Sequence, residues 1–210
     1  MNANAEVNKH ARFIGIVGMP NSGKDVCAEY LQENFGYLSI RMSSIVVEEA
    51  KKRAGGKDPD RSLLQEIGAE LRREHGKGVM AQRIVDDWIP WLLMNVQRAL
   101  ENQRSLFDPK KLHFVFNGVR SGEEVEVFRR EFGDEFMLIA ICSSFETRYA
   151  RAKLRNRIGF DNFDRQQFRK LDNADLRLGL GDAIGLADSY IINERSPEEL
   201  LEQIRKIVAP

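Results

Sequence analysis

Residues 18–25 read Gly18-Met19-Pro20-Asn21-Ser22-Gly23-Lys24-Asp25 and match the pattern G-x-x-x-x-G-K. They follow the apolar run FIGIV at 13–17 and precede a helical pattern from Lys24 to Phe35. A strand, a glycine-rich turn and a helix in this order aim several backbone N–H groups at one point, which creates an anion site. A chance glycine turn is the alternative, and the combination of strand, spacing, lysine and helix argues against it. We therefore predict a phosphate-binding loop in which Lys24 contacts the β- and γ-phosphates of a nucleotide.

Asp25 departs from the usual form of this pattern, which ends in a Ser or Thr that binds magnesium. A carboxylate can also hold Mg²⁺, because this ion prefers hard oxygen ligands. The alternative is an acidic residue that only stabilises the helix dipole. We predict that the segment from Gly18 to Val26 binds ATP, with Asp25 as a ligand of Mg²⁺.

On both sides of this loop, short apolar runs alternate with amphipathic segments, which is typical of a parallel sheet covered by helices. Strands are expected at 13–17, 37–42, 112–116, 136–142 and 189–193. Helices are expected at 24–35, 43–53, 60–76, 123–132 and after 197, together with a long one over 79–100 that Pro90 kinks. The pattern predicts an α/β protein with the three-layer P-loop NTPase fold, in which helices flank a five-stranded parallel sheet.

The composition of the chain bears on its partners, its location and its capacity to bind zinc. The chain has 210 residues, which suits one domain, and its 32 basic residues balance 32 acidic ones. This zero net charge does not favour nucleic acid as a partner. No apolar stretch is long enough for a membrane span, and the polar N-terminus lacks a signal-peptide pattern, so we expect a cytoplasmic protein. The two cysteines, Cys27 and Cys142, are far apart and are expected to be reduced thiols rather than zinc ligands.

The segment from 145 to 181 is rich in arginine and helical in pattern. Arg148, Arg151 and Arg155 are three and four residues apart, so they share one helical face. A solvated basic face is one interpretation. The other is a mobile lid whose arginines stabilise charge during phosphoryl transfer, with Arg155 and Arg157 as catalytic contacts and Gly159 as a hinge. We predict one domain over 1–210, with its core at 12–144 and 182–210 and a small helical lid at about 145–181.

Three stretches resemble P-loop small-molecule kinases of the nucleoside monophosphate kinase-like group. Residues 187–193 (ADSYIIN) and 196–200 (SPEEL) are similar to the C-terminal signature of dephospho-CoA kinases, where this loop contacts the adenine of ATP. Residues 117–120 (NGVR) resemble a segment whose arginine contacts the acceptor phosphate in nucleotide kinases. The whole chain is most similar to an archaeal family related to adenylate kinase and dephospho-CoA kinase. The resemblance implies that Asn193 and Arg151 bind the nucleotide and that Arg120 is catalytic.

The chain also departs from these kinases. Asn117 stands where they carry an Asp that organises the magnesium shell, and Val46 and Val47 stand where the archaeal relatives begin their acceptor helix with Asp-x-x-Arg. Residues 95–111 look like an insertion relative to these archaeal relatives.

We expect an ATP-dependent kinase of a small molecule, such as a (deoxy)nucleoside monophosphate or dephospho-CoA, held by Arg120 and by Arg41 or Arg72. The alternatives are a nucleotide-binding regulator and, less favoured by charge, a kinase of nucleic-acid ends. Trp88 and Trp91 are expected to pack in the core or to form a homodimer contact.

Overall fold

The computed structural model describes residues 12–55, 58–101, 112–155 and 164–208. Its sheet consists of the strands β1 (Phe13–Val17), β2 (Leu38–Arg41), β3 (Phe114–Val119), β4 (Phe136–Cys142) and β5 (Ser189–Ile192). All neighbouring strands are parallel, and their order across the sheet is β2-β3-β1-β4-β5. The predicted α/β fold with a five-stranded parallel sheet is therefore confirmed.

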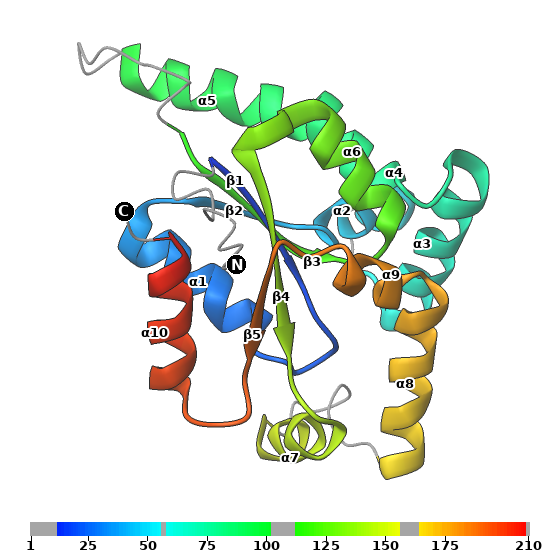
Figure 1. Ribbon diagram of the computed structural model, residues 1–210. Coiled ribbons are helices and arrows are strands. Elements are labelled where there is room, and N and C mark those ends of the chain that lie inside the picture. The colour runs from blue at the N-terminus through cyan, green and yellow to red at the C-terminus, as the bar shows by residue number, and fades with distance from the viewer. Residues whose placement is uncertain (1–11, 56–57, 102–111, 156–163, 209–210) are drawn as a thin grey trace.

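Helices cover both faces of the sheet (Figure 1). They are α1 (Lys24–Phe35), α2 (Ser44–Arg53), α3 (Arg61–His75), α4 (Val79–Arg83), α5 (Ile89–Glu101), α6 (Gly122–Phe132), α7 (Phe145–Arg155), α8 (Arg165–Arg177), α9 (Leu180–Gly185) and α10 (Pro197–Val208). Local signals begin several of them: Asp60 and Ser121 accept hydrogen bonds from the backbone of the first turns of α3 and α6. Asp164 and Gln167 form a complete capping box at the start of α8.

The alternation of side chains along β1 creates two separate hydrophobic cores. Ile14 and Ile16 pack on one face with residues of α1 and α10. Phe13 and Val17 pack on the other face, with residues of α2 to α4, α6 and α9. A stack of aromatic rings dominates the second core, and the centroids of Phe116 and Phe128 lie 4.3 Å apart. The sheet is thus buried on both sides, as expected for parallel strands.

β3 extends further than its apolar run predicts. The sequence indicates an end at Phe116, but the strand continues through Asn117 to Val119. Gly118 lies in the left-handed region, with a φ of 93°, at a shift in register where Val17 pairs with Val119. The predicted boundary is wrong because an irregular strand end carries no periodic signal. As a result, Asn117 stands beside Ile16 and Arg41 at the carboxyl end of the sheet.

The long helix expected over 79–100 is interrupted just before Pro90. Residues Ile84–Trp88 form a π-helical turn between α4 and α5, in which the Ile89 N–H donates to the Ile84 carbonyl. Pro90 has no N–H to continue the regular ladder, which accounts for an irregular turn at this place. Trp88 packs against the core and donates from Nε1 to Glu48 at 3.1 Å, whereas Trp91 is 57% exposed.

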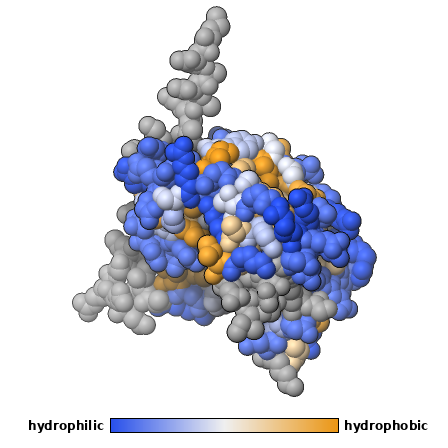
Figure 2. All heavy atoms as spheres, turned by 90° about the horizontal axis from the view of Figure 1, so that it is seen from below, coloured by the Kyte–Doolittle hydropathy of each residue, from blue (hydrophilic) through white to orange (hydrophobic). Residues whose placement is uncertain are grey.

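The carboxyl ends of β1 and β4 point toward α7 and α8 in Figure 1. Viewed from that end, the surface is mostly hydrophilic, with small hydrophobic groups between the polar ones (Figure 2). Among the described helices, none combines the length and the apolar character that crossing a bilayer requires.

Candidate functional site

The predicted phosphate-binding loop connects β1 to α1 at the carboxyl end of the sheet. It turns tightly, because the Ser22 N–H donates to the Met19 carbonyl at 3.1 Å. The glycines at its two ends, Gly18 and Gly23, are required because a side chain would not fit at either position. A Cβ on Gly18 would lie 2.5 Å from the Ile141 carbonyl oxygen, and one on Gly23 would lie 2.3 Å from Asn193 Nδ2. Gly23 also has a φ of 103°, which L side chains rarely adopt.

The Ser22 carbonyl is the anchor of this loop. It accepts hydrogen bonds from Asn193 Nδ2 at 2.8 Å, from Ser143 Oγ at 3.3 Å and from Arg151 Nη1 at 3.5 Å. In a planar trans peptide the next N–H points the opposite way. The Gly23 N–H is therefore directed away from Asn193, at the N-terminus of α1. Asn193 and Arg151, both predicted to bind nucleotide, hold the loop from this side; a direct contact of either with a nucleotide stays a prediction.

A buried ion pair joins the loop to the helices that follow β4. Arg148 of α7 donates from both Nη atoms to the two carboxylate oxygens of Asp172 in α8, each at 2.7 Å. Arg148 is 4% exposed, and it also donates to the Pro20 carbonyl at 3.3 Å. A solvated basic face is thus the wrong interpretation for Arg148. The sequence did not reveal this contact because Asp172 lies in another helix.

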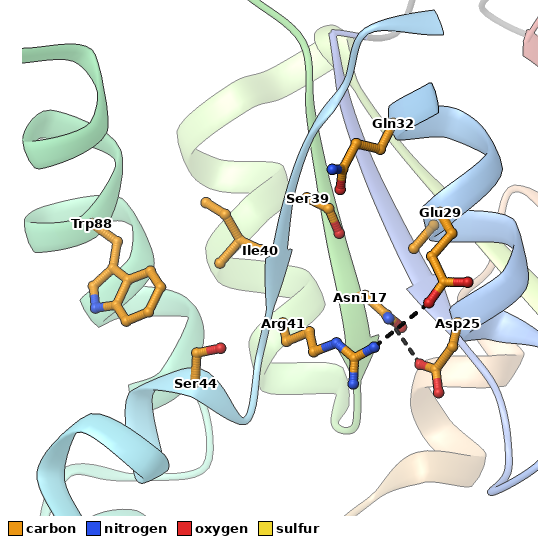
Figure 3. Close-up of a pocket in the computed structure, with 10 residues that line it drawn as sticks. Asp25, Glu29, Gln32, Ser39, Ile40, Arg41, Ser44, Trp88 and Asn117 are labelled. Atoms are coloured by element: carbon orange, nitrogen blue, oxygen red, sulfur yellow. Dashed lines mark hydrogen bonds and ion pairs between the residues drawn. The ribbon is translucent and has the colours of Figure 1, made fainter. Parts of the chain in front are cut away.

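Asp25 and Asn117 meet at the first turn of α1. Asn117 Nδ2 donates to Asp25 Oδ1 at 2.9 Å, although the two residues are far apart in the sequence. Both line a cavity of about 330 Å³ between α1 and β2, into which Glu29, Ser39 and Arg41 also project (Figure 3). Arg41 forms an ion pair with Glu29 at 3.9 Å. The apolar Ala28, Ile40 and Trp88 belong to the lining, which also contains Asp25, the residue predicted to bind magnesium.

Arg120, the predicted acceptor contact, lies in a cluster of charges beyond β3. Its Nη1 forms an ion pair with Asp175 of α8 at 3.3 Å, and its backbone N–H donates to Glu124 Oε2 at 2.7 Å. Burial raises the pKa of Glu124 to about 7, against the opposing effects of the Arg120 N–H and the charges of Arg72 and Arg120. Burial also lowers the pKa of Arg72. Asp175 and Glu124 are site residues that sequence reasoning missed.

The remaining predicted residues are placed as follows. Lys24 begins α1 beside Gly118, on which a Cβ would lie 4.0 Å from Lys24 Cε. Val26 lies in the first turn of α1 and is 39% exposed. Arg155 ends α7, but its side chain, like Arg157 and Gly159, lies outside the described part of the chain.

The two cysteines are buried or half-buried thiols. Cys27 and Cys142 are free, and burial, with a smaller effect of Asp25, raises the pKa of Cys27 to about 12. Burial also raises the pKa of Cys142. Within residues 12–55, 58–101, 112–155 and 164–208, no group of three His, Cys, Asp or Glu side chains is arranged to hold a metal ion.

Comparison with other proteins identifies relatives over nearly the whole chain. The chain is 32% identical to a UPF0200 protein of Methanothermobacter thermautotrophicus over 195 residues, which covers 93% of this chain and 88% of the relative. It is 33% identical to a UPF0200 protein of Pyrococcus furiosus, with 92% and 94% covered. No family model matches the chain.

Among solved structures, a gluconokinase from Sinorhizobium meliloti superimposes with a TM-score of 0.54 at 13% identity, covering 95% of this chain and 93% of that one. A protein from Eubacterium ventriosum gives 0.50 at 11% identity, with 93% and 97% covered. These likenesses show that the chain has a P-loop kinase-like fold.

The buried Arg148–Asp172 pair generates a stability prediction. Arg148→Met leaves the Asp172 carboxylate buried without its partner, so the free energy of unfolding is expected to fall by about 3–5 kcal/mol. Urea denaturation measures this loss. Arg165→Met, which removes an exposed ion pair with Glu146, is the matched control and should cost less than about 1 kcal/mol. Equal losses in the two variants would contradict the role of the buried pair.

The buried Glu124 generates a prediction of pH dependence. Its pKa of about 7 in the folded chain exceeds the ordinary value of 4.5, so the folded state favours the neutral carboxyl. Its contribution to stability is complete below pH 4.5 and is lost as the pH rises through 7, by up to about 3 kcal/mol. Glu124→Gln keeps an acceptor for the Arg120 N–H and should flatten this part of the profile in urea denaturation between pH 5 and 8. Glu126 is exposed, so Glu126→Gln should keep the wild-type pH dependence of the free energy of unfolding. The same pH dependence in Glu124→Gln would show that Glu124 is not its source.

Proposed function

The chain belongs to the UPF0200 family, and we propose that it is an ATP-dependent phosphotransferase that moves the γ-phosphoryl group of ATP to a small-molecule acceptor. One observation carries the proposal: the Ser22 carbonyl is fixed by Asn193, Ser143 and Arg151, so the Gly23 N–H faces away from them at the start of α1. The N-terminus of a helix that is also preceded by such a loop binds phosphate well.

The charges around the loop support a triphosphate as the ligand. Lys24 follows Gly23 directly, and its ammonium group is a compact cation of the kind that contacts β- and γ-phosphates. The loop lies against β4 and Asn193 without room for side chains at Gly18 and Gly23, so its shape is fixed before the nucleotide binds. Such preorganisation reduces the entropy that binding costs.

The residues present also fit Mg²⁺. Magnesium in kinase sites is held by one or two carboxylates and otherwise by substrate phosphates and water. Asp25 supplies a carboxylate at the end of the loop, and Asn117 supplies a buried amide beside it. When bound, the ion would neutralise charge on the phosphates. The protein's own contribution is to position the loop, to place Lys24 and to orient Asp25.

An anionic acceptor, nucleotide-like or otherwise phosphorylated, suits the cluster of charges beyond β3. Arg120 and Arg72 supply two cationic groups there, and Arg120 is 40% exposed on its side chain. The cavity of about 330 Å³ that contains Arg41 is also lined by Asn117. We propose that the acceptor binds between these two regions, and that Arg155 and Arg157, from the arginine-rich segment, close over the transferred group. Positioning and charge neutralisation would then account for most of the rate.

A nucleotide-binding regulator without turnover is the second candidate. The ion pair between Arg120 and Asp175 favours it, because this arginine is already neutralised by the protein itself. Measurement of turnover distinguishes the two candidates.

Lys24→Ala is expected to weaken ATP binding by about tenfold or more, since it removes one charge-assisted contact with the phosphates. Titration calorimetry with ATP and Mg²⁺ measures the change, and circular dichroism confirms that the fold persists. Lys206→Ala, on the exposed surface of α10, is the control and should bind as the wild type does. An unchanged affinity in Lys24→Ala would exclude the loop as the triphosphate site.

Turnover is expected once an acceptor is supplied from a panel of nucleoside monophosphates, deoxynucleoside monophosphates and dephospho-CoA. ADP formation by a coupled assay identifies the acceptor. Arg155→Ala and Arg157→Ala should then each lower kcat by a factor on the order of 10², with a smaller change in KM, because the contacts strengthen in the transition state. A wild-type kcat in both variants would indicate that the arginine-rich segment is a solvated helix and does not act as a lid. ATP binding without any ADP formation across the panel would favour the regulator.

A further inference from the structure

The contact between Asp25 and Asn117 contains one feature that a structural role leaves unexplained. Asn117 is 5% exposed, and its side chain points toward Asp25 (Figure 3). A carboxylate only accepts hydrogen bonds, so the amide nitrogen must face Asp25, as the 2.9 Å distance from Nδ2 to Oδ1 shows. The amide oxygen is thereby fixed on the other side of the group.

This amide oxygen accepts no hydrogen bond from any described residue, although it is buried. A buried polar atom without a partner is costly, and such atoms in folded proteins usually have a reason. An amide oxygen is a hard ligand, and it is also a good acceptor for the hydrogen of a metal-bound water. An ordered water would satisfy this oxygen, and beside a carboxylate at the end of a phosphate loop such a water can belong to the hydration shell of a Mg²⁺ ion.

The number of carboxylates at this site also supports Mg²⁺ as the partner of the Asn117 oxygen. P-loop NTPases generally hold Mg²⁺ with a hydroxyl group on the loop and a carboxylate on a neighbouring strand. Here the loop carries the carboxylate, Asp25, and the strand carries the neutral group, Asn117. Each arrangement contains one negative charge. An acid at both positions would place two carboxylates within about 3 Å of each other, which raises the pKa of one of them.

We propose that Asp25 and Asn117 are a single magnesium-holding pair in which the charged and the neutral group have exchanged places between loop and strand. Asn117 is thus a positioning residue that orients Asp25 through its nitrogen and faces the hydrated ion with its oxygen. The inference rests on the proposed nucleotide-binding function, and it explains how a chain without the usual strand carboxylate keeps a metal site.

Four proteins test whether the charged and the neutral group have exchanged places. They are the wild type, Asp25→Asn, Asn117→Asp, and the double variant that carries both changes and so reverses the pair. The quantity measured is the Mg²⁺ enhancement, which is the ratio of ADP affinity with Mg²⁺ to that with EDTA, by titration calorimetry. Electron paramagnetic resonance of Mn²⁺ in the ADP complex reports on the metal directly. Glu33→Gln, an exposed change on α1, is the control and should leave the enhancement unchanged.

Asp25→Asn is expected to lose about tenfold or more of the enhancement, since the pair then lacks a carboxylate. The reversed pair should recover it to within about threefold of the wild type, because one carboxylate is present again. Asn117→Asp should bind ADP more weakly in EDTA and show a larger enhancement, because the second carboxylate repels the phosphates until the metal binds. If the buried Asn117→Asp change prevents folding, Asn117→Ala supplies the test: it should lower the enhancement about tenfold, and an unchanged value would refute the pair.

A reversed pair that folds, binds ADP in EDTA and shows no recovery would overturn the inference while leaving the proposed function intact. An undiminished enhancement in Asp25→Asn would do the same. Failure of the wild type to bind ADP or ATP under any condition would instead overturn the proposed function, and the inference with it.

Discussion

The hydrogen bonds to the Ser22 carbonyl are the constraint on which the rest of the site depends. Asn193 comes from the end of β5, Ser143 from the end of β4 and Arg151 from α7, and all three donate to this one oxygen. Three residues that lie 121, 129 and 171 positions from Ser22 therefore determine one peptide orientation in the loop. If the peptide were reversed, a carbonyl oxygen instead of an N–H would face an incoming phosphate, and the site would repel its ligand.

A second set of contacts, made by Arg148, links the arginine-rich segment to the loop. Arg148 reaches the Pro20 carbonyl while it is paired with Asp172, so α7 and α8 are connected to the phosphate loop by buried, charge-assisted bonds. At its other end, α8 places Asp175 on Arg120. A change in the position of α8 would thus alter both the support of the loop and the charge available to an acceptor. Such coupling would let the proposed lid respond to both proposed substrates.

The loop and most of the sheet were predictable because their signals are local. The G-x-x-x-x-G-K pattern, the apolar run at 13–17 and the helix after Lys24 lie within one continuous segment, and the other strands show as separate apolar runs. What escaped prediction depends on partners far along the chain: the pairing of Arg148 with Asp172, the burial of Glu124 and the bond from Asn117 to Asp25. The extension of β3 through Gly118 escaped for another reason, since a register shift leaves no periodic pattern.

A crystal structure of the chain with Mg²⁺ and a non-hydrolysable ATP analogue tests the central claim most directly. The expected result is a triphosphate inside the loop from Gly18 to Lys24, with the Gly23 N–H and the Lys24 ammonium on its oxygens and a metal ion beside Asp25. Phosphates bound at another place on the chain, or a loop in which the Ser22 carbonyl has left Asn193 and faces the nucleotide, would contradict the account.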